Sequence, residues 1–374
     1  MKEADKLHQT EFRISLRALR RNLETFSDCL EPKTKLMLML KASAYGHSST
    51  LLAREFEGDE RISYFAVAYV DEGVELRKAG IEKNILVLNP SPNSFDKLVN
   101  HCLEPEIHNL DLLRKFNRFL DQHHQQMAPY PVHLKFNTGM NRLGFEPLEI
   151  PQLASFFSSQ KNLRTQSIMT HLSSSDLPKE DEFTKDQLTS FAEIIKATTD
   201  FQDEDTFFHC LNSNGIYRFP EHQYDLARLG IGLYGTSTIP QLREKLIPAA
   251  SLHTKVCQIR NVKKGDSISY SRSGRAPQDT QIATLSIGYA DGFNRFCGNG
   301  RWQVEIDGEL YPTIGNVCMD LSMVDIGHAE VQLGDEVTIF GGKKSIYEYA
   351  THLGTITYEV MCALGSRVRK KMIA

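Results

Sequence analysis

The sequence has 374 residues, of which 41% are hydrophobic and 24% charged, and 43 Lys and Arg against 47 Asp and Glu give a formal net charge of −4. This composition is that of a globular protein with a large core and excludes disordered and fibrous classes, and the near balance of charge gives no electrostatic basis for binding nucleic acid or an anionic membrane. No apolar run reaches the ~20 residues of a membrane helix, and the N-terminus lacks the apolar stretch of a signal peptide, so we expect a cytoplasmic protein. Seven cysteines without any CxxC spacing argue against a disulfide framework and a zinc site, and we expect no metal.

Eight short β-rich runs recur between Lys35 and Gly235, and stretches with helical spacing separate most of them. This alternation favours an α/β fold of the (β/α)8 TIM-barrel type over an open doubly wound sheet. Two links are weak, because the run at Leu103 is short and acidic and the segment from Asn212 to Tyr217 barely allows a helical turn. The predicted strands are Leu36–Ala42, Tyr64–Val70, Asn84–Asn89, Leu103–Ile107, Val132–Phe136, Gln166–His171, Phe207–Leu211 and Leu226–Leu233. The predicted helices are His47–Phe56, Val74–Ala79, Leu110–Leu120, Leu148–Ser158 and Phe183–Thr198.

The pattern changes after Tyr234 to short strand-like runs punctuated by glycine, with no helix-length amphipathic segment before Ile346 to Leu353. We therefore expect a barrel over residues 10–241 and a mainly β C-terminal domain over residues 242–374, on which residues 1–9 could pack. The runs are Thr254–Arg260, Ile282–Ile287, Gln303–Ile306, Met323–Asp325 and Glu336–Phe340.

In a barrel of this kind the active site collects at the C-terminal ends of the strands. Lys41 lies in the first predicted strand, where the cost of desolvating an ammonium lowers the pKa of a lysine and suits it to Schiff-base chemistry. From position alone, a paired or snorkelling structural lysine is an equally good interpretation. Further predicted strand ends carry Lys135, Asn137, Arg142, His171, Ser213, Arg228 and Gly230.

Together these residues describe a site with a reactive amine, small and hydroxyl residues that could hold a phosphate, and fixed cations. The sequence contains no P-loop, dinucleotide-binding glycine motif, nucleophile elbow or HExxH zinc motif. A phosphate-bearing aldehyde cofactor fits what remains.

Five segments then occur in order, LKASAYGH, LARLGIGLYG, LSIGYADG, GNVCMD and TYEVMCALGSRV. The chain resembles the alanine racemase family in these segments, over about Phe12 to Arg369. The resemblance implies a pyridoxal 5'-phosphate enzyme with a barrel followed by a β domain. It further implies a homodimer with shared active sites that interconverts L- and D-alanine and supplies D-alanine for peptidoglycan.

The resemblance also implies roles for individual residues. Lys41 would bind the cofactor as a Schiff base and act as one catalytic base, and Tyr270 would be the second base, reaching the site from the partner subunit. Racemisation needs proton removal on one face of a planar carbanion and delivery on the other, which two opposed bases provide. Arg228 would face the ring nitrogen and, because guanidinium is never deprotonated, leave that nitrogen unprotonated.

His171 would pack near the ring and Arg228. Arg142 would lie near the substrate carboxylate, Met319 would supply a backbone N–H to it from the partner subunit, and Tyr289 would line the entrance. The phosphate contacts implied by the resemblance are Tyr45, Ser213, Gly230, Ile231 and Tyr358.

Several positions depart from the family pattern. Ser271 and Arg272 follow Tyr270 where the family has SYG, which puts the geometry of that loop in doubt, and Asn137 stands where an acidic residue is common. Lys135 matches a lysine that is carbamylated in some members. The alternatives are a racemase of lysine, serine or broad specificity, a basic amino acid decarboxylase with the same plan and cofactor, and a single-barrel pyridoxal-phosphate carrier, which would lack the C-terminal domain.

Overall fold

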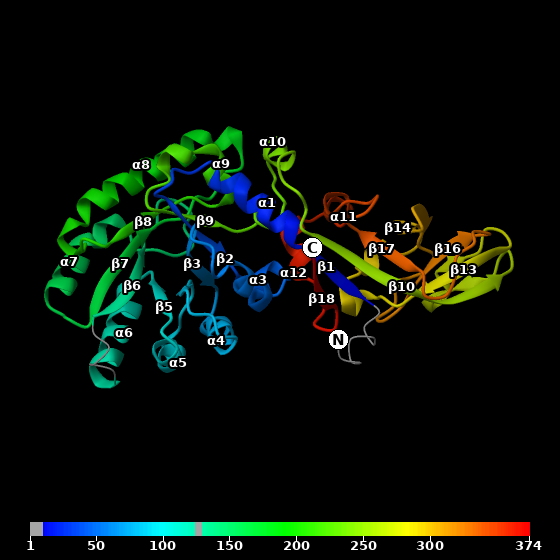
Figure 1. The fold of residues 1–374 in the computed structure, drawn as a ribbon, viewed down its shortest axis with the longest axis horizontal. Helices are drawn as coiled ribbons and strands as arrows, with labels where there is room; N and C mark the ends of the chain where they lie inside the picture. The colour runs from blue at the N-terminus through cyan, green and yellow to red at the C-terminus, as the bar shows by residue number, and fades with distance from the viewer. Residues whose placement is uncertain (1–9, 124–128) are drawn as a thin grey trace. The chain divides into compact units, whose positions relative to one another are not determined.

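The computed structural model describes residues 10–123 and 129–374, which form two compact units (Figure 1). The barrel unit comprises Arg20–Ala44 and Ser48–Ile247. The C-terminal unit comprises residues 10–19, Tyr45–His47 and Pro248–Ala374. The expectation that residues 1–9 pack on the β domain lies outside the described residues.

The barrel unit is built on an eight-stranded parallel sheet in the order β8-β7-β6-β5-β4-β3-β2-β9. Backbone bonds from Asp225 N to Phe208 O (3.3 Å) and from Arg228 N to Leu211 O (3.0 Å) join the two end strands, so the sheet is nearly closed. The predicted TIM-type barrel is therefore confirmed. Its strands are β2 (Lys35–Met39), β3 (Ile62–Val67), β4 (Asn84–Val87), β5 (Glu104–Ile107), β6 (Tyr130–Lys135), β7 (Leu163–Met169), β8 (Phe207–His209) and β9 (Leu226–Leu229).

Helices alternate with these strands, and their buried faces follow the predicted spacing. In α6 the buried residues Leu112, Leu113, Phe116 and Leu120 recur every three or four positions. The weakest predicted link is a short helix, α9, because the Asn212 side chain accepts a hydrogen bond from Gly215 N and caps its first turn. The helices are α1 (Leu16–Ser27), α3 (Ser49–Phe56), α4 (Val70–Lys78), α5 (Phe95–Asn100), α6 (Leu110–His123), α7 (Ile150–Ser158), α8 (Asp181–Ala197), α9 (Ser213–Arg218) and α10 (Pro240–Arg243).

The C-terminal unit is mainly β, as predicted, and contains a mixed sheet in the order β15-β14-β17-β10-β1-β18, with β13 pairing β10 and β16. Its elements are β1 (Glu11–Ser15), β10 (Ala250–Val262), β11 (Ser267–Ile268), β12 (Gly274–Arg275), β13 (Thr280–Leu285), β14 (Gln303–Ile306), β15 (Glu309–Pro312), β16 (Ser322–Gly327), β17 (Glu336–Phe340), α11 (Ile346–His352), α12 (Thr357–Cys362) and β18 (Arg369–Ile373).

The observed units differ from the predicted boundaries of 10–241 and 242–374. Residues 11–15 fall within the predicted barrel range, and as β1 they pair antiparallel with β10 and parallel with β18 in the C-terminal unit. The second boundary lies between Ile247 and Pro248. The sequence could not indicate this arrangement, because the pairing partners of β1 lie more than 200 residues along the chain.

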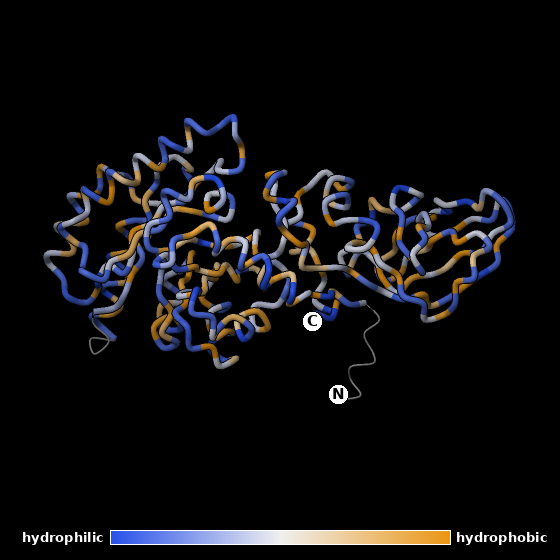
Figure 2. The backbone as a smooth tube through the Cα atoms, turned by 45° about the horizontal axis from the view of Figure 1, so that its top comes forward, coloured by the Kyte–Doolittle hydropathy of each residue, from blue (hydrophilic) through white to orange (hydrophobic). Residues whose placement is uncertain are grey.

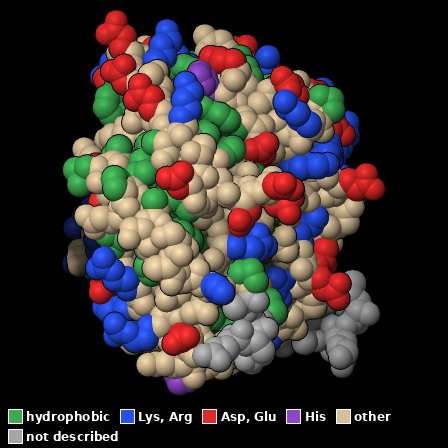
Figure 3. Space-filling model, turned by 90° about the vertical axis from the view of Figure 1, so that its left-hand side faces the viewer, with side chains coloured by type: hydrophobic (Ala, Val, Ile, Leu, Met, Phe, Trp, Pro, Cys, Tyr) green, Lys and Arg blue, Asp and Glu red, His purple; other side chains and the backbone are tan. Residues whose placement is uncertain are grey.

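Apolar segments follow the strands within each unit, and polar segments follow the outer turns (Figure 2). Acidic and basic side chains are interspersed on the face drawn in Figure 3, in keeping with the near-neutral composition. In the described part of the chain, no helix combines the length and hydropathy that a bilayer-spanning segment needs.

Candidate active site

Lys41 opens a left-handed turn at the C-terminal end of the first barrel strand. It was expected inside that strand, but β2 ends at Met39 and Lys41 begins the turn α2 (Lys41–Tyr45). The four residues that follow Lys41 in this turn all have φ of 53°. This left-handed conformation costs a non-glycine residue roughly 1–2 kcal/mol. Such strain persists only where surrounding contacts impose it.

Glu72 on α4 is one source of that constraint. Its carboxylate accepts hydrogen bonds from the backbone N–H groups of Ala42 (2.6 Å), Ala68 (2.7 Å) and Tyr69 (3.1 Å). It therefore ties the peptide next to Lys41 to the end of β3. The sequence analysis missed Glu72, since an acidic residue in the first turn of a helix is common.

The surroundings of Lys41 favour its neutral amine. Burial lowers the pKa of Lys41 below its ordinary value, and the Arg142 and Lys135 cations lower it further, while Glu106 and Glu72 act in the opposite direction. A lysine with a lowered pKa is a better nucleophile and base near neutral pH. Lys41 thus has the protonation behaviour that a covalent cofactor attachment needs.

Lys135 forms an ion pair that the sequence analysis did not anticipate. Its Nζ donates to both carboxylate oxygens of Glu106, at 3.1 and 3.3 Å, and Glu106 is 0% exposed. Burial raises the pKa of Glu106, and Lys135 opposes that effect. The acidic character of the run at Leu103 was the available signal, although it was read only as a weakness of the strand. Arg142, on the loop after β6, is exposed and makes no hydrogen bond to a described residue.

Arg228 on β9 is 3% exposed and held by two of its three guanidinium nitrogens. Nη1 donates to His209 Nδ1 (2.6 Å) and His209 O (3.2 Å), and Nη2 donates to Thr170 O (2.7 Å), Cys210 O (2.9 Å) and His171 Nδ1 (3.2 Å). Among the described residues, nothing accepts a hydrogen bond from Nε. Burial lowers the pKa of Arg228 to about 10, so it remains a cation at neutral pH.

The two histidines beside Arg228 are neutral acceptors. Burial and the Arg228 cation hold the pKa values of His171 and His209 well below the ordinary value. Because His209 accepts from a guanidinium N–H through Nδ1, it carries its single proton on Nε2, and His171 Nδ1 lies 3.2 Å from Nη2, whose two hydrogens are shared among three acceptors. His171 thus lies against Arg228 as expected, whereas His209 was missed because nothing in the sequence separates it from an ordinary core histidine.

Ser213, Gly230 and Ile231 also lie together in the barrel unit. Ser213, the first residue of α9, accepts hydrogen bonds through Oγ from Gly230 N (3.0 Å) and Gly232 N (3.2 Å) in the turn after β9. The N–H of Ile231 donates to none of the described residues. The turn therefore has a hydroxyl and a backbone donor for an anion.

These barrel residues fit the expected phosphate-bearing aldehyde cofactor. Lys41 is an amine of lowered pKa, the Arg228 Nε–H lacks an acceptor in the described chain, and the turn at Ile231 retains a backbone donor. An aldehyde needs a neutral amine, a pyridine nitrogen needs a donor, and a phosphate needs N–H and O–H groups.

The remaining predicted residues belong to the C-terminal unit. Tyr45 and Tyr358 lie close together there, with ring centroids 6.0 Å apart. Burial and the neighbouring Tyr358 raise the pKa of Tyr45, which therefore stays a phenol. A neutral phenol can donate a hydrogen bond to an anion.

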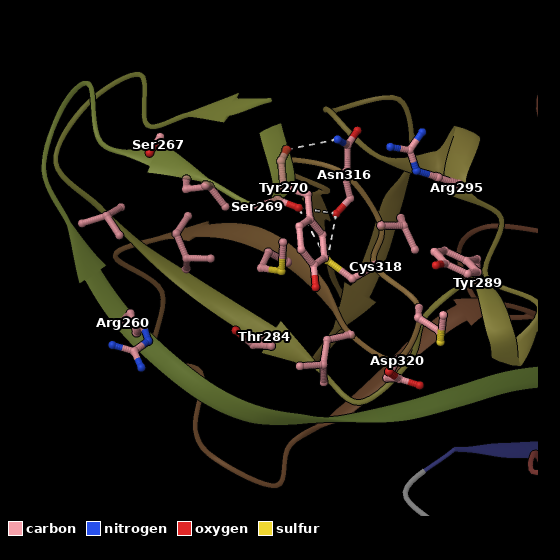
Figure 4. A pocket seen from close by; sticks show the side chains of 17 residues that line it. Arg260, Ser267, Ser269, Tyr270, Thr284, Tyr289, Arg295, Asn316, Cys318 and Asp320 are labelled. Atoms are coloured by element: carbon pink, nitrogen blue, oxygen red, sulfur yellow. Dashed lines mark hydrogen bonds between the residues drawn. The ribbon is translucent and has the colours of Figure 1, made fainter. Parts of the chain in front are cut away.

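Tyr270, Tyr289 and Met319 line one cavity of about 820 Å³ in the C-terminal unit (Figure 4). They are 72%, 43% and 53% exposed, respectively. Asn316 holds the loop that carries Tyr270, since its Nδ2 donates to Tyr270 O (3.3 Å) and its O accepts from Ser269 Oγ (2.8 Å). The structure thus brings Tyr270 and Met319, the two residues expected to come from the partner subunit, into one cavity with Tyr289, which was expected at the entrance.

The loop after Tyr270 is strained at the positions that depart from the family pattern. Ser271 has φ of 57° and Arg272 has φ of 51°, conformations that glycine adopts without cost. The serine therefore keeps the left-handed backbone geometry that a glycine would provide at this position.

Comparisons with known proteins identify two family domains in this chain. The family model described as alanine racemase, N-terminal domain, matches residues 14–238, and that of the C-terminal domain matches residues 249–372. The alanine racemase of Desulforamulus reducens is 35% identical over 96% of this chain and 98% of its own length. A solved alanine racemase from Clostridium difficile 630 is 31% identical, with a TM-score of 0.88 over 98% of this chain and 97% of its own. The alanine racemase of Bacillus anthracis, solved with bound L-Ala-P, is 30% identical, with a TM-score of 0.89 over 98% of this chain and 95% of its own.

Proposed function

This chain belongs to the alanine racemase family, and on that premise we propose that it interconverts L- and D-alanine with pyridoxal 5'-phosphate as cofactor, in the cytoplasm, supplying D-alanine for peptidoglycan. One observation carries the proposal. The same barrel holds Lys41, whose pKa is lowered, and the buried Arg228, whose Nε has no acceptor among the described residues. The bound L-Ala-P of the Bacillus anthracis relative supports alanine as the substrate.

The barrel residues would hold the cofactor in a fixed orientation. Lys41 would attach it through Nζ, Arg228 would donate through Nε to the ring nitrogen, and His171 would pack beside the ring. When bound, the cofactor supplies an electron sink for the charge that develops on the substrate α-carbon. In the barrel unit, the phosphate would be held by the Ser213 hydroxyl and by the turn at Gly230 and Ile231, where the Ile231 N–H has no acceptor among the described residues.

Two residues would move the proton. The Nζ of Lys41 exchanges the α-proton on one face of the substrate, and the Tyr270 hydroxyl does so on the opposite face. Arg142 and the backbone N–H of Met319 would bind the substrate carboxylate, and Tyr289 would line the entrance. Because Arg228 stays charged at neutral pH, it donates a hydrogen bond rather than a proton, which limits charge accumulation on the ring.

The proposal includes a homodimer in which each site combines Lys41 of one subunit with Tyr270 of the other. The high exposure of Tyr270 and Met319 in the described chain supports it, because large apolar side chains at a functional cavity are candidates for coverage by a second copy.

Mixed dimers test this arrangement directly. Lys41→Ala and Tyr270→Phe homodimers should each be inactive, but dimers re-formed from an equal mixture should recover about a quarter of wild-type activity, because half of them contain one intact site. Failure to recover activity, with heterodimers detected by mass, would contradict shared sites.

The substrate is tested by chiral chromatography after the holoenzyme is incubated with a mixture of L-amino acids. D-alanine alone is the expected product. D-lysine, D-arginine or D-serine would contradict the substrate assignment, and carbon dioxide release without any D-isomer would overturn the racemase in favour of a decarboxylase. Lys41→Ala, which should lack the absorbance of the covalently bound cofactor, is the control.

A further inference from the structure

A chain of polar side chains, buried except at its Glu104 end, crosses the interior of the barrel unit, where barrels of this type ordinarily hold branched apolar residues. It runs from Arg228 on β9 through His209 on β8, Ser167 on β7 and His133 on β6 to Glu104 on β5. Each link joins neighbouring strands, and the successive distances are 2.6, 3.1, 2.7 and 2.8 Å. His209, Ser167 and His133 are all 0% exposed.

The two ends of this relay give its hydrogen bonds a single direction. A guanidinium can only donate and a carboxylate can only accept, so Arg228 donates to His209 Nδ1 and Glu104 accepts from His133 Nε2. His209 then carries its proton on Nε2 and donates to Ser167 Oγ. Ser167 Oγ lies 2.7 Å from His133 Nδ1, and the Ser167 hydroxyl hydrogen remains available for that nitrogen once Oγ has accepted from His209. Every donor along the chain therefore faces Glu104.

We propose that Ser167 and Glu104 are positioning residues for Arg228, which they hold through His133 and His209 in the Nε2–H tautomers. The inference rests on the proposed function in one respect, the approach of Arg228 Nε to the cofactor ring nitrogen. Neither Ser167 nor Glu104 touches the cofactor in this arrangement, and both act through the guanidinium.

The opposite tautomer would disrupt the site. With its proton on Nδ1, His209 would turn an N–H toward the Arg228 N–H at a separation of 2.6 Å, and two donors would face each other without an acceptor between them. The guanidinium would then have to move, and Nε would move with it. A second donor fixes the far end of the relay, since the Tyr64 hydroxyl also donates to Glu104 Oε2, at 3.0 Å.

Nitrogen-15 NMR of the full-length protein, labelled on histidine, reads the tautomers directly, with His133→Asn and His209→Asn variants to assign the signals. We expect both histidines to carry a proton on Nε2 and His209 to carry none on Nδ1, with and without pyridoxal 5'-phosphate. A proton on Nδ1 of His209, or on both of its nitrogens, would overturn the proposal.

A pair of variants on β7 tests the positioning role. Ser167→Ala removes the central link, and Thr165→Val is the matched control, because Thr165 lies two residues away, is 1% exposed, and its hydroxyl has no hydrogen-bond partner in the described chain. Ser167→Ala should weaken cofactor binding by roughly 5- to 20-fold and expose His209 to Nδ1 protonation, while Thr165→Val should stay within about twofold.

Equal cofactor affinities and unchanged His209 signals in the two variants would overturn the positioning role. If Ser167→Ala does not fold, the wild-type tautomers still decide the question. The proposed function can fail independently of the relay. Wild-type protein that binds no cofactor or makes no D-alanine would refute the proposed function, whereas the histidine tautomers of the cofactor-free protein would still test the relay.

Discussion

Replacing Glu72 with alanine should release the backbone on which Lys41 is mounted. The substitution removes three charge-assisted hydrogen bonds, of which the one from Ala42 N is 2.6 Å long. Such bonds contribute about 1.5–3 kcal/mol each when buried, and partial exposure of Glu72 reduces this, so we expect the turn to lose roughly 2–4 kcal/mol of local stability. The strained residues after Lys41 would then relax, and kcat should fall roughly 10- to 100-fold because Nζ is displaced.

Hydrogen exchange measured by mass spectrometry on peptides that span Lys41 is the appropriate assay, because it reports local rather than global stability. A loss of about 2 kcal/mol accelerates exchange roughly 30-fold. Glu75→Ala is the matched control, since Glu75 is an exposed acid on the same helix. Glu72→Gln, which keeps an acceptor oxygen but loses the charge, should fall between them. Equal exchange in Glu72→Ala and Glu75→Ala would refute the reasoning.

Three further predictions concern the backbone and pH. Gly46→Ala should cost roughly 3 kcal/mol or more of stability, because φ is +84° and the new Cβ would lie 2.2 Å from Met361 O. The control Gly80→Ala, where φ is +89° and the space is open, should cost about 1 kcal/mol, and equal losses of melting temperature in the two variants would contradict the prediction. Ser271→Gly should raise stability by about 0.5–1 kcal/mol by relieving the strain at φ of 57°, and Ser271→Ala should not, so a matching gain in both would exclude strain as the cause. The pKa values of His171 and His209 in the folded protein lie well below 6.5, so below that pH the unfolded chain binds more protons than the folded protein does. The free energy of unfolding should therefore fall as the pH drops, by up to about 1.4 kcal/mol per pH unit for each histidine. His171→Gln should reduce the pH dependence of the free energy of unfolding between pH 6.5 and 5.5, as measured by urea titration. An unchanged pH dependence would exclude His171 as one of its sources.

Local pattern was sufficient to predict most of the fold. All eight barrel strands lie within a few residues of their predicted positions, because buried parallel strands read as short apolar runs separated by amphipathic helices. Local pattern gave no information where pairing is remote, as in β1, which alternates buried and half-buried residues and pairs with β10 and β18 far along the chain. A short segment of this kind carries no signal of the sheet that it joins.

The candidate site shows the same limit at the level of single residues. Lys41, Arg228, Ser213 and His171 could be chosen because they follow predicted strands, at the edge where a barrel collects its chemistry. Glu72, Glu106 and His209 could not, because an acid or a histidine in an ordinary element gains significance only from what it contacts. Ring tautomers and the Lys135 ion pair likewise depend on neighbours from other strands.

The sequence by itself determined the family, the two-part plan and the residue types of the site, since those are properties of ordered motifs and local periodicity. Only the tertiary structure decided which groups hold the reactive ones in place: Glu72 on the peptide after Lys41, and the relay of Glu104, His133, Ser167 and His209 behind Arg228. The physical reason is that hydrogen-bond direction, desolvation and backbone strain arise between segments that the chain order keeps apart and the closed sheet brings together.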